Sequence, residues 1–422
     1  MLKSSVALLL LWVCWLPFSG CQSPPRPAKI TLTAADSARF SFIKMEENRI
    51  ENSPFLDPVF QKMWEQRVKT GQKISIVHIG DSHILGDFLT RFVRERLQKE
   101  FGNAGRGLIF PYRQAGTNGP SDYVFEGKGG WSANDLNTAK NDVPVGVAGF
   151  SVASTNADGS LRLILRTDSS DIGRLSKLTI FHPNTETAFD FEITDNDHPE
   201  AEKAMPVIDG DWFTSYYFDN PTGELTIKNL RKSPGQKSCR IDGICIENEL
   251  SGIIYHAIGV NGARIEHFTN AKFFSKQVAD LNPDLIIISL GTNEGQNDDL
   301  SENDIKKQVV ELVEKLRESC GSPAFLLTTP ADSYLRGKGF NPHMARISRG
   351  IVAAAKESGA GYWDLFEVTG GQNSSQKWRN AGLFTRDSVH YTREGYQVQG
   401  KLFFQAMMNG YNEFVNNNSI NK

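Results

Sequence analysis

The sequence has few cysteines, no long apolar segment and no excess of either charge. Five cysteines in 422 residues exclude a disulfide-stapled scaffold, and none of them has the spacing of zinc ligands. The apolar run at residues 6–16 is shorter than the roughly 20 residues of a bilayer-spanning helix. Lys and Arg total 46 against 49 Asp and Glu. Without a basic block, the charge pattern of a nucleic-acid-binding protein is missing.

The composition that remains is that of a folded protein with large cores. Hydrophobic residues make up 39% of the chain and aromatic residues 10%, which favours globular packing over disorder. A chain of this length exceeds one ordinary domain, so we expect two or more folding units.

The first residues, MLKSSVALLLLWVCWLPFSGC, have the pattern of an export signal. Lys3 precedes the apolar run at residues 6–16, and the small residues Ser19 and Gly20 follow it. We therefore expect a signal peptide at residues 1–20 and an exported protein.

Cys21 directly follows the expected cleavage point, and its context resembles the lipobox of bacterial lipoproteins. Phe18 stands where Leu is usual in that motif. The resemblance implies a lipid anchor on Cys21, followed by a Pro-rich spacer over residues 21–44. It also implies a cell-envelope location, periplasmic or anchored to the outer membrane. Simple secretion after cleavage near Gly20 is the alternative.

Two further cysteines, Cys239 and Cys245, lie in the segment SCRIDGICIEN. In one extended strand, at about 3.3 Å per residue, they would be too far apart to form a disulfide. A hairpin turn at Asp242 and Gly243 would bring them within reach. We expect buried free thiols, and the bridge stays an alternative.

Strand and helix patterns alternate in two separated parts of the chain. The apolar, β-branched run KISIVHIG at residues 73–80 predicts a buried strand, and residues 86–101 predict the helix after it. Further strands are expected at residues 253–259, 285–290, 324–329 and 361–365, and helices at 304–318, 344–357 and 393–414. Strands that are apolar on both faces are typical of a parallel sheet covered by helices on both sides.

The segment between these two parts has a different pattern. Residues 116–250 contain short strand-like runs separated by turn residues, such as GSLRLILRT, SKLTIFHP and FDFEITD. This pattern predicts an antiparallel β-sandwich. We therefore expect a discontinuous α/β domain at residues 45–115 and 251–416, with the sandwich inserted between its two parts. Such an insertion costs little loop entropy when its ends lie close together.

The motif Gly80-Asp81-Ser82-His83 stands where the first strand passes into its helix. A serine at this turn lies at the carboxyl end of the parallel strands, where ligands of such folds bind. Ser82 is therefore a candidate nucleophile. A helix cap is the plainer interpretation, because serine is a favoured N-cap residue.

The pair Asp387 and His390 precedes the last predicted helix. A serine hydroxyl attacks only if a base takes its proton, and a histidine base needs a carboxylate on Nδ1 to fix its tautomer. Asp and His three residues apart on a turn can meet in this way. On its own, such a pair is also common in loops.

Two more turns follow predicted strands and carry hydrogen-bond donors. Gly262 lies after the strand at residues 253–259, and Asn293 lies after the strand at residues 285–290. Acyl transfer needs donors aimed at the developing oxyanion, which backbone N–H groups and an Asn amide supply. Singly, these are ordinary turn sequences.

Together, the four motifs resemble the SGNH, or GDSL-like, hydrolase superfamily. The resemblance implies a flavodoxin-like three-layer fold and a triad of Ser82, Asp387 and His390. It also implies an oxyanion hole from the Ser82 and Gly262 N–H groups and the Asn293 side chain, and no metal or other cofactor. His83 departs from the family motif, which has Leu at that position.

The inserted segment and the residues of the motifs are similar to those of the bacterial peptidoglycan O-acetylesterases. Their inserted jelly-roll-like module resembles family 35 carbohydrate-binding modules. This resemblance implies an acetylesterase that removes O6-acetyl groups from muramic acid in peptidoglycan. Nothing in a triad selects a sugar, so acetylxylan or pectin is an alternative substrate. A non-enzymatic glycan-binding lipoprotein is the second alternative.

Overall fold

The computed structural model describes residues 34–137, 144–166, 174–201, 203–296 and 299–419. The expected signal peptide, Cys21 and most of the spacer lie outside the described residues.

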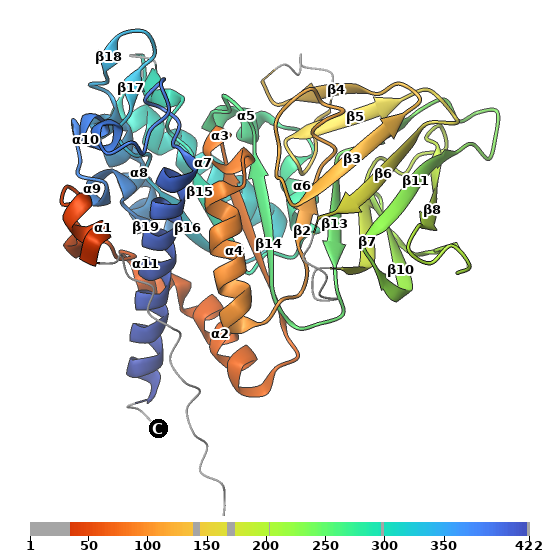
Figure 1. Ribbon diagram of the computed structural model, residues 1–422, viewed down its shortest axis with the longest axis horizontal. Helices are drawn as coiled ribbons and strands as arrows, with labels where there is room; N and C mark the ends of the chain where they lie inside the picture. Colours follow the sequence, from red (N-terminus) through yellow and green to blue (C-terminus); the bar gives the residue numbers. More distant parts are fainter. Residues whose placement is uncertain (1–33, 138–143, 167–173, 202, 297–298, 420–422) are drawn as a thin grey trace, which may run out of the picture.

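A five-stranded parallel sheet forms the centre of the α/β part (Figure 1). Its strands, in spatial order, are β14 (Gly252–Gly259), β1 (Lys73–Gly80), β15 (Leu285–Ser289), β16 (Ala324–Thr328) and β19 (Gly361–Trp363). All neighbours are parallel. The first strand along the chain lies second in space, which is the flavodoxin-like order. The predicted α/β fold class is confirmed.

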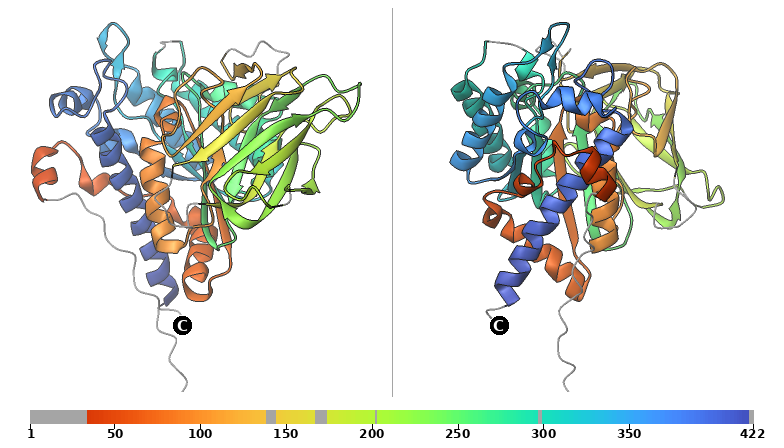
Figure 2. Two further views of the ribbon diagram at one scale, coloured as in Figure 1. Left: turned by 45° about the vertical axis from the view of Figure 1, so that its right-hand side comes forward. Right: turned by 60° about the vertical axis from the view of Figure 1, so that its left-hand side comes forward.

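Helices cover both faces of this sheet, as the three-layer prediction requires (Figure 2). On one face, Val77 and Ile79 of β1 belong to the core that includes α7 (Glu302–Cys320) and α8 (Met344–Ser358). On the other, Ile74 and Ile76 belong to the core with α2 (Asp57–Lys69), α4 (Phe88–Phe101) and α11 (Arg393–Ser419). Every residue of β1 after Lys73 is buried, which explains the continuous apolar run in its sequence.

Helix α7 shows how local sequence sets an element that the core then holds. Ser301 and Asp304 form a capping box, in which the Ser301 side chain accepts from the Asp304 N–H and the Asp304 carboxylate accepts from the Ser301 N–H. The buried face consists of Ile305, Val309, Leu312, Val313 and Leu316. This is the stripe that the helical periodicity predicts.

The helix predicted at residues 86–101 is wrong at its start. The structure has a short helix α3 (Ser82–Leu85) followed by α4, with Asp87 between them in a left-handed conformation, φ 56°. The Asp87 carboxylate is buried and accepts hydrogen bonds from Arg94 and Arg106. These two arginines hold an aspartate in a conformation that local periodicity does not reveal.

Antiparallel sheets form the region between α4 and β14, at the right in Figure 1. One sheet has the order β2-β13-β7-β10-β9, a second β3-β6-β11-β8, and a third β12-β5-β4. Their bounds are β2 (Gly107–Ile109), β3 (Tyr123–Lys128), β4 (Ser132–Asp135), β5 (Phe150–Ser154), β6 (Ser160–Leu165), β7 (Leu175–Phe181), β8 (Asp190–Asp195), β9 (Pro206–Asp209), β10 (Phe213–Thr222), β11 (Glu224–Leu230), β12 (Cys239–Ile241) and β13 (Gly243–Glu247). Because β2 pairs with β13, these sheets begin before the predicted boundary at residue 116. A carbohydrate-binding sandwich in this region stays a prediction.

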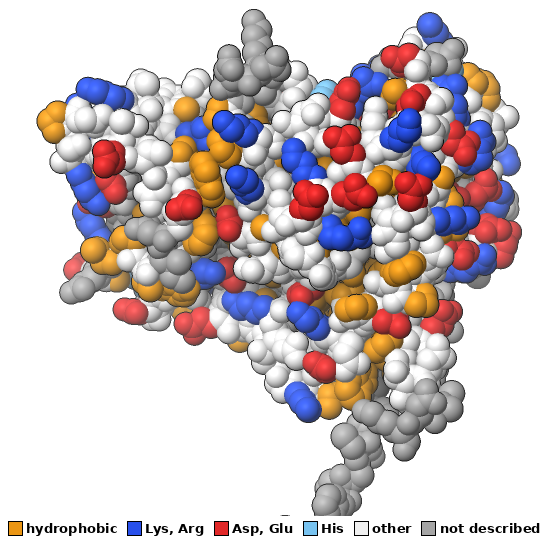
Figure 3. All heavy atoms as spheres, turned by 180° about the vertical axis from the view of Figure 1, so that it is seen from behind, with side chains coloured by type: hydrophobic (Ala, Val, Ile, Leu, Met, Phe, Trp, Pro, Cys, Tyr) orange, Lys and Arg blue, Asp and Glu red, His pale blue; other side chains and the backbone are white. Residues whose placement is uncertain are grey.

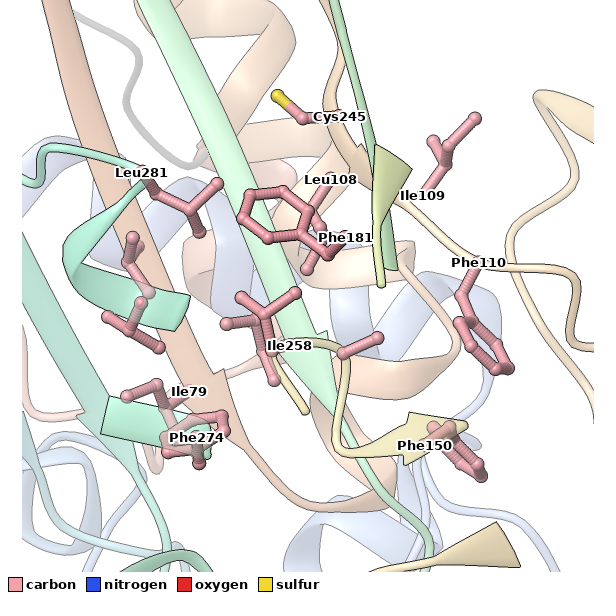
Figure 4. Close-up of a cluster of buried hydrophobic side chains, with 14 of the residues drawn as sticks. Ile79, Leu108, Ile109, Phe110, Phe150, Phe181, Cys245, Ile258, Phe274 and Leu281 are labelled. Atoms are coloured by element: carbon pink, nitrogen blue, oxygen red, sulfur yellow. The ribbon is translucent and has the colours of Figure 1, made fainter. Parts of the chain in front are cut away.

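The two parts of the molecule share one hydrophobic core. Figure 4 shows side chains from β1 and β14, such as Ile79 and Ile258, near Phe181 of β7 and Leu108 of β2. All four belong to one cluster of buried residues. The antiparallel part is therefore packed directly on the parallel sheet.

Cys239 and Cys245 are free, buried thiols, as the sequence analysis expects. The Cys239 thiol donates to the Asn229 side-chain oxygen, with Sγ and Oδ1 3.1 Å apart. Burial raises the pKa of Cys239 to about 11. A thiol in this state is a packing group and a weak nucleophile.

The described part of the chain has no helix that could cross a membrane. None of its helices combines the length with the apolar composition that a bilayer crossing requires. On the face shown in Figure 3, acidic and basic side chains are interspersed.

Candidate active site

Ser82 lies directly beyond the carboxyl end of β1, as the first residue of α3. The Asp81 carboxylate caps this helix by accepting from the His83 N–H, with Oδ1 and N 2.9 Å apart. A side chain at Gly80 would come within 2.3 Å of Ile84 and 2.8 Å of the Ser289 carbonyl oxygen. Only glycine permits this tight turn. The turn sets Ser82 next to the topological switch point of the sheet, between β1 and β15.

The structure brings Ser82 together with the predicted acid-base pair. Ser82 Oγ and His390 Nε2 are 2.8 Å apart, and His390 Nδ1 and Asp387 Oδ2 are 2.6 Å apart. An ionised carboxylate only accepts, so Nδ1 carries the proton and Nε2 faces the serine hydroxyl as an acceptor. This arrangement can take a proton from Ser82 as its oxygen attacks a carbonyl carbon.

Several hydrogen bonds converge on the Asp387 carboxylate. Burial alone would raise the pKa of Asp387. The His390 ring, the backbone N–H groups of His390 and Val389, and the Thr385 hydroxyl all donate to it and hold its pKa well below the ordinary value. Asp387 therefore stays an acceptor across the neutral and mildly acidic range.

The turn that carries Asp387 and His390 is fixed by its own backbone and by a neighbouring segment. Ser388, between them, is buried and has a left-handed conformation, φ 53°. The Thr385 N–H donates to the His390 carbonyl oxygen over 2.8 Å. The Tyr334 N–H, from the short strand β17 (Tyr334–Leu335), donates to the Ser388 carbonyl oxygen over 2.9 Å.

Asn293 and Gly262 lie on two loops that contact each other beside Asp81. Asn293 Nδ2 donates to the Ala263 carbonyl oxygen over 2.9 Å, and Asp81 Oδ2 lies 3.4 Å from the same nitrogen. Gly262 has φ 73°, which favours glycine. The structure thus gathers the predicted oxyanion-hole residues at the strand end that carries Ser82.

Glu294, the residue after Asn293, is a buried carboxyl that supports the same loop. Its Oε1 accepts from the Ile265 N–H over 2.6 Å, while Oε2 has no hydrogen-bond partner among the residues that the structure describes. Burial raises the pKa of Glu294 to about 7. Glu294 thereby ties the loop after β15 to the start of α5 (Ile265–Asn270), which follows the Gly262 loop.

The antiparallel part also contacts the Gly262 loop. The Asn261 side chain donates to Thr117 Oγ1 over 3.1 Å and to Asn118 Oδ1 over 3.0 Å. The Asn137 side chain donates in turn to the Asn261 carbonyl oxygen. Loops of the inserted region therefore form one wall beside the predicted oxyanion hole.

A small cavity of about 50 Å³ lies beneath the site, between the sheet and α11. Its lining includes Asp81, His83, Thr292 and Gln399. This volume holds a few water molecules. Among the residues that the structure describes, no group of three or more His, Cys, Asp or Glu side chains could hold a metal ion.

Some residues of the site cannot be predicted from the sequence. Thr385, Tyr334 and Asn261 bond to the site or its loops, but their partners lie on turns whose geometry no periodicity encodes. His83 enters the sequence analysis only as a departure from a motif. Its neighbours on α11 become visible only in the fold.

A comparison with protein families finds a match in the C-terminal part of the chain. Residues 245–398 match the GDSL-like Lipase/Acylhydrolase family. This part of the chain is similar to GDSL-like acylhydrolases. The matched stretch includes Gly262, Asn293, Asp387 and His390, whereas Ser82 precedes it. The antiparallel region lies between Ser82 and the other four in the sequence.

A solved structure extends the likeness beyond these matched residues. The structure described as "Peptidoglycan O-acetylesterase in action, 5 min" aligns with a TM-score of 0.70 and 22% identity, over 84% of this chain and 96% of that chain. A match over so much of the chain takes in antiparallel strands as well as the parallel sheet, and at this identity it shows a shared fold.

Two further solved structures overlap with about a third of the chain. The carbohydrate acetylesterase Est24 from Sinorhizobium meliloti has 15% identity and a TM-score of 0.27, over 37% of this chain and 76% of that chain. A putative GDSL-like lipase from Parabacteroides merdae has 12% identity and a TM-score of 0.31, over 37% and 74%. These low scores carry no argument. No curated protein matches the sequence.

Proposed function

We propose that this protein is an exported serine esterase that removes O-acetyl groups from a cell-wall glycan, with peptidoglycan as the substrate. The observation that carries the proposal is the contact between Ser82 Oγ and His390 Nε2, 2.8 Å, with Asp387 on the far side of the imidazole. The similarity to GDSL-like acylhydrolases supports the reaction class.

In the proposed reaction, Ser82 Oγ attacks the acetyl carbonyl carbon while His390 Nε2 takes the hydroxyl proton. The tetrahedral oxyanion receives hydrogen bonds from the Ser82 and Gly262 N–H groups and from Asn293 Nδ2. The ester bond then breaks, and the sugar hydroxyl leaves with the proton from His390. Water attacks the acetyl-serine with His390 again as the base, and acetate leaves.

The proposed substrate is supported by a shared fold and by an expected location. An overall fold shared with a protein described as a peptidoglycan O-acetylesterase supports an acetylated glycan, and muramic acid O6-acetyl is the group we propose. The export signal expected at residues 1–20 and the lipid anchor expected on Cys21 would bring the enzyme to the cell envelope, where that polymer is found.

Replacement of the nucleophile tests the reaction. Ser82→Ala should fold with an unchanged urea midpoint and release no p-nitrophenol from p-nitrophenyl acetate. A fluorophosphonate should label the wild type at Ser82 and leave the variant unlabelled. Retained turnover in Ser82→Ala contradicts the proposed mechanism. Absence of labelling in the wild type favours the non-enzymatic glycan-binding lipoprotein instead.

Two polymers test the substrate. Acetate release should be faster from O-acetylated peptidoglycan than from acetylxylan at equal acetyl content. The opposite order contradicts the peptidoglycan assignment and leaves the esterase mechanism standing. Metabolic labelling with a radioactive fatty acid, compared between the full chain and Cys21→Ser, tests the anchor. Equal labelling of the two contradicts acylation at Cys21.

A further inference from the structure

His390 needs more than two hydrogen bonds to keep its orientation, because the site is open on one side. Its side chain is 32% exposed, and that of Asp387 is 47% exposed. An imidazole at such a site can turn toward water, which would break the contact to Ser82. Whatever packs behind the ring therefore decides how much time it spends in the productive orientation.

The group behind His390 is a second imidazole, that of His83. The two ring centroids are 5.4 Å apart, with 35° between the ring planes. His83 is also surrounded by Tyr391 and Tyr396, with centroids 5.8 and 5.9 Å from its own. Phe88 stacks on Tyr396, with the two ring centroids 5.9 Å apart. A row of rings thus runs from Phe88 to the proposed base.

The His83 ring is held by a hydrogen bond to Tyr396, with Nδ1 and Oη 3.0 Å apart. Burial raises the pKa of Tyr396, so its phenol keeps the proton. The hydrogen bond between the phenol and Nδ1 fixes the plane of the His83 ring.

His83 also remains uncharged beside the base. Burial lowers the pKa of His83, the nearby His390 lowers it further, and Asp81 and Asp387 oppose the change. The phenols of Tyr391 and Tyr396 are the other titratable groups around it. Since His390 becomes positively charged during attack, a neutral neighbour avoids the repulsion that a second cation would add.

We propose that His83 is a positioning residue for His390: its ring, fixed by Tyr396, packs behind the imidazole and keeps Nε2 directed at Ser82. This inference rests on the proposed esterase function. It assigns a role to the position at which the sequence departs from the GDSL motif.

Three variants test the role. His83→Ala removes the ring and should lower kcat on p-nitrophenyl acetate about 10- to 100-fold, because a misplaced group costs this much, with KM within about twofold. The acid limb of the kcat/KM profile should move to higher pH, since water that enters the space stabilises the charged imidazole. His83→Leu restores bulk and should recover part of kcat. Tyr396→Phe, which removes only the hydroxyl, should show a smaller loss.

Tyr255→Phe is the matched control. Like the hydroxyl of Tyr396, the hydroxyl of Tyr255 bonds to a histidine. Tyr255 lies on β14, and its Oη is 2.6 Å from Nδ1 of the buried His78 on β1. This variant should keep the wild-type kcat and pH profile. Urea midpoints of all variants separate loss of fold from loss of positioning.

Three results would overturn the proposal: wild-type kcat and pH profile in His83→Ala, no recovery in His83→Leu, or an equal kcat loss in Tyr255→Phe and Tyr396→Phe. Each of these leaves the esterase function intact if Ser82→Ala is inactive. Turnover retained in Ser82→Ala contradicts the function itself, so the two failures are distinguishable.

Discussion

The two halves of the site are held in different ways. Ser82 follows β1, a strand that pairs with a neighbour on each side and is buried after its first residue. Asp387 and His390 lie on a turn outside the sheet, half-exposed and fixed by individual hydrogen bonds. The fold therefore places the nucleophile, whereas local side-chain and backbone contacts place the base. Changes in the strands that support Ser82 should affect stability, and changes in the turn that carries Asp387 and His390 should affect rate.

The strongest test acts on the turn. Asp387→Asn keeps the shape of the side chain but no longer holds His390 in the tautomer with a proton on Nδ1. We expect kcat on p-nitrophenyl acetate to fall by about 10³- to 10⁴-fold, with an unchanged urea midpoint. A large loss of stability in this variant would contradict the distinction between strand and turn, because the turn would then be part of the structural core.

A pair of glycine substitutions tests the sheet against the loop. A methyl group at Gly259, the last residue of β14, would lie 2.1 Å from the Leu85 backbone nitrogen, so α3 would have to move. Gly259→Ala should lower the free energy of unfolding by roughly 1–3 kcal/mol and reduce fluorophosphonate labelling of Ser82.

Gly262→Ala is the loop member of the pair. Within the described part of the chain, a methyl group there meets only the Asn137 side chain, at 3.6 Å. The left-handed backbone costs about 1 kcal/mol. Urea unfolding of both variants gives the order. If Gly262→Ala is the less stable of the two, the sheet is not the main support of the site.

The smallest expected effect concerns Glu294, which ties the loop after β15 to the start of α5. Its pKa is raised to about 7 in the folded protein from an ordinary value near 4.5. The folded state therefore binds the proton more tightly, and this contribution to stability is complete below pH 4.5 and lost as the pH rises through 7. Glu294→Gln should flatten the fall of the unfolding free energy between pH 5 and 7 by on the order of 1 kcal/mol. An identical slope in wild type and variant would show that Glu294 is charged in the fold.

Much of the α/β part could be predicted from the sequence because its signals are local. The strand at residues 73–80 has the predicted bounds, since burial on both faces demands apolar residues without a break. Three of the four motifs come together because parallel strands end at one edge of their sheet. The start of α4 was missed because Asp87 takes its conformation from distant arginines. The contacts of Tyr334 and Asn261 depend in the same way on segments that are remote in sequence.

The antiparallel region separates β1 from both strands that pair with it. During synthesis the ribosome releases β1 long before β14 and β15, so an apolar strand with two unpaired edges must wait while well over a hundred residues follow. Such a strand is a site for mispairing between nascent chains. The same wait postpones assembly of the site, because His390 follows Ser82 by 308 positions in the chain. A product truncated between them would therefore carry the nucleophile without its base, which delays activity until residue 390 has been made.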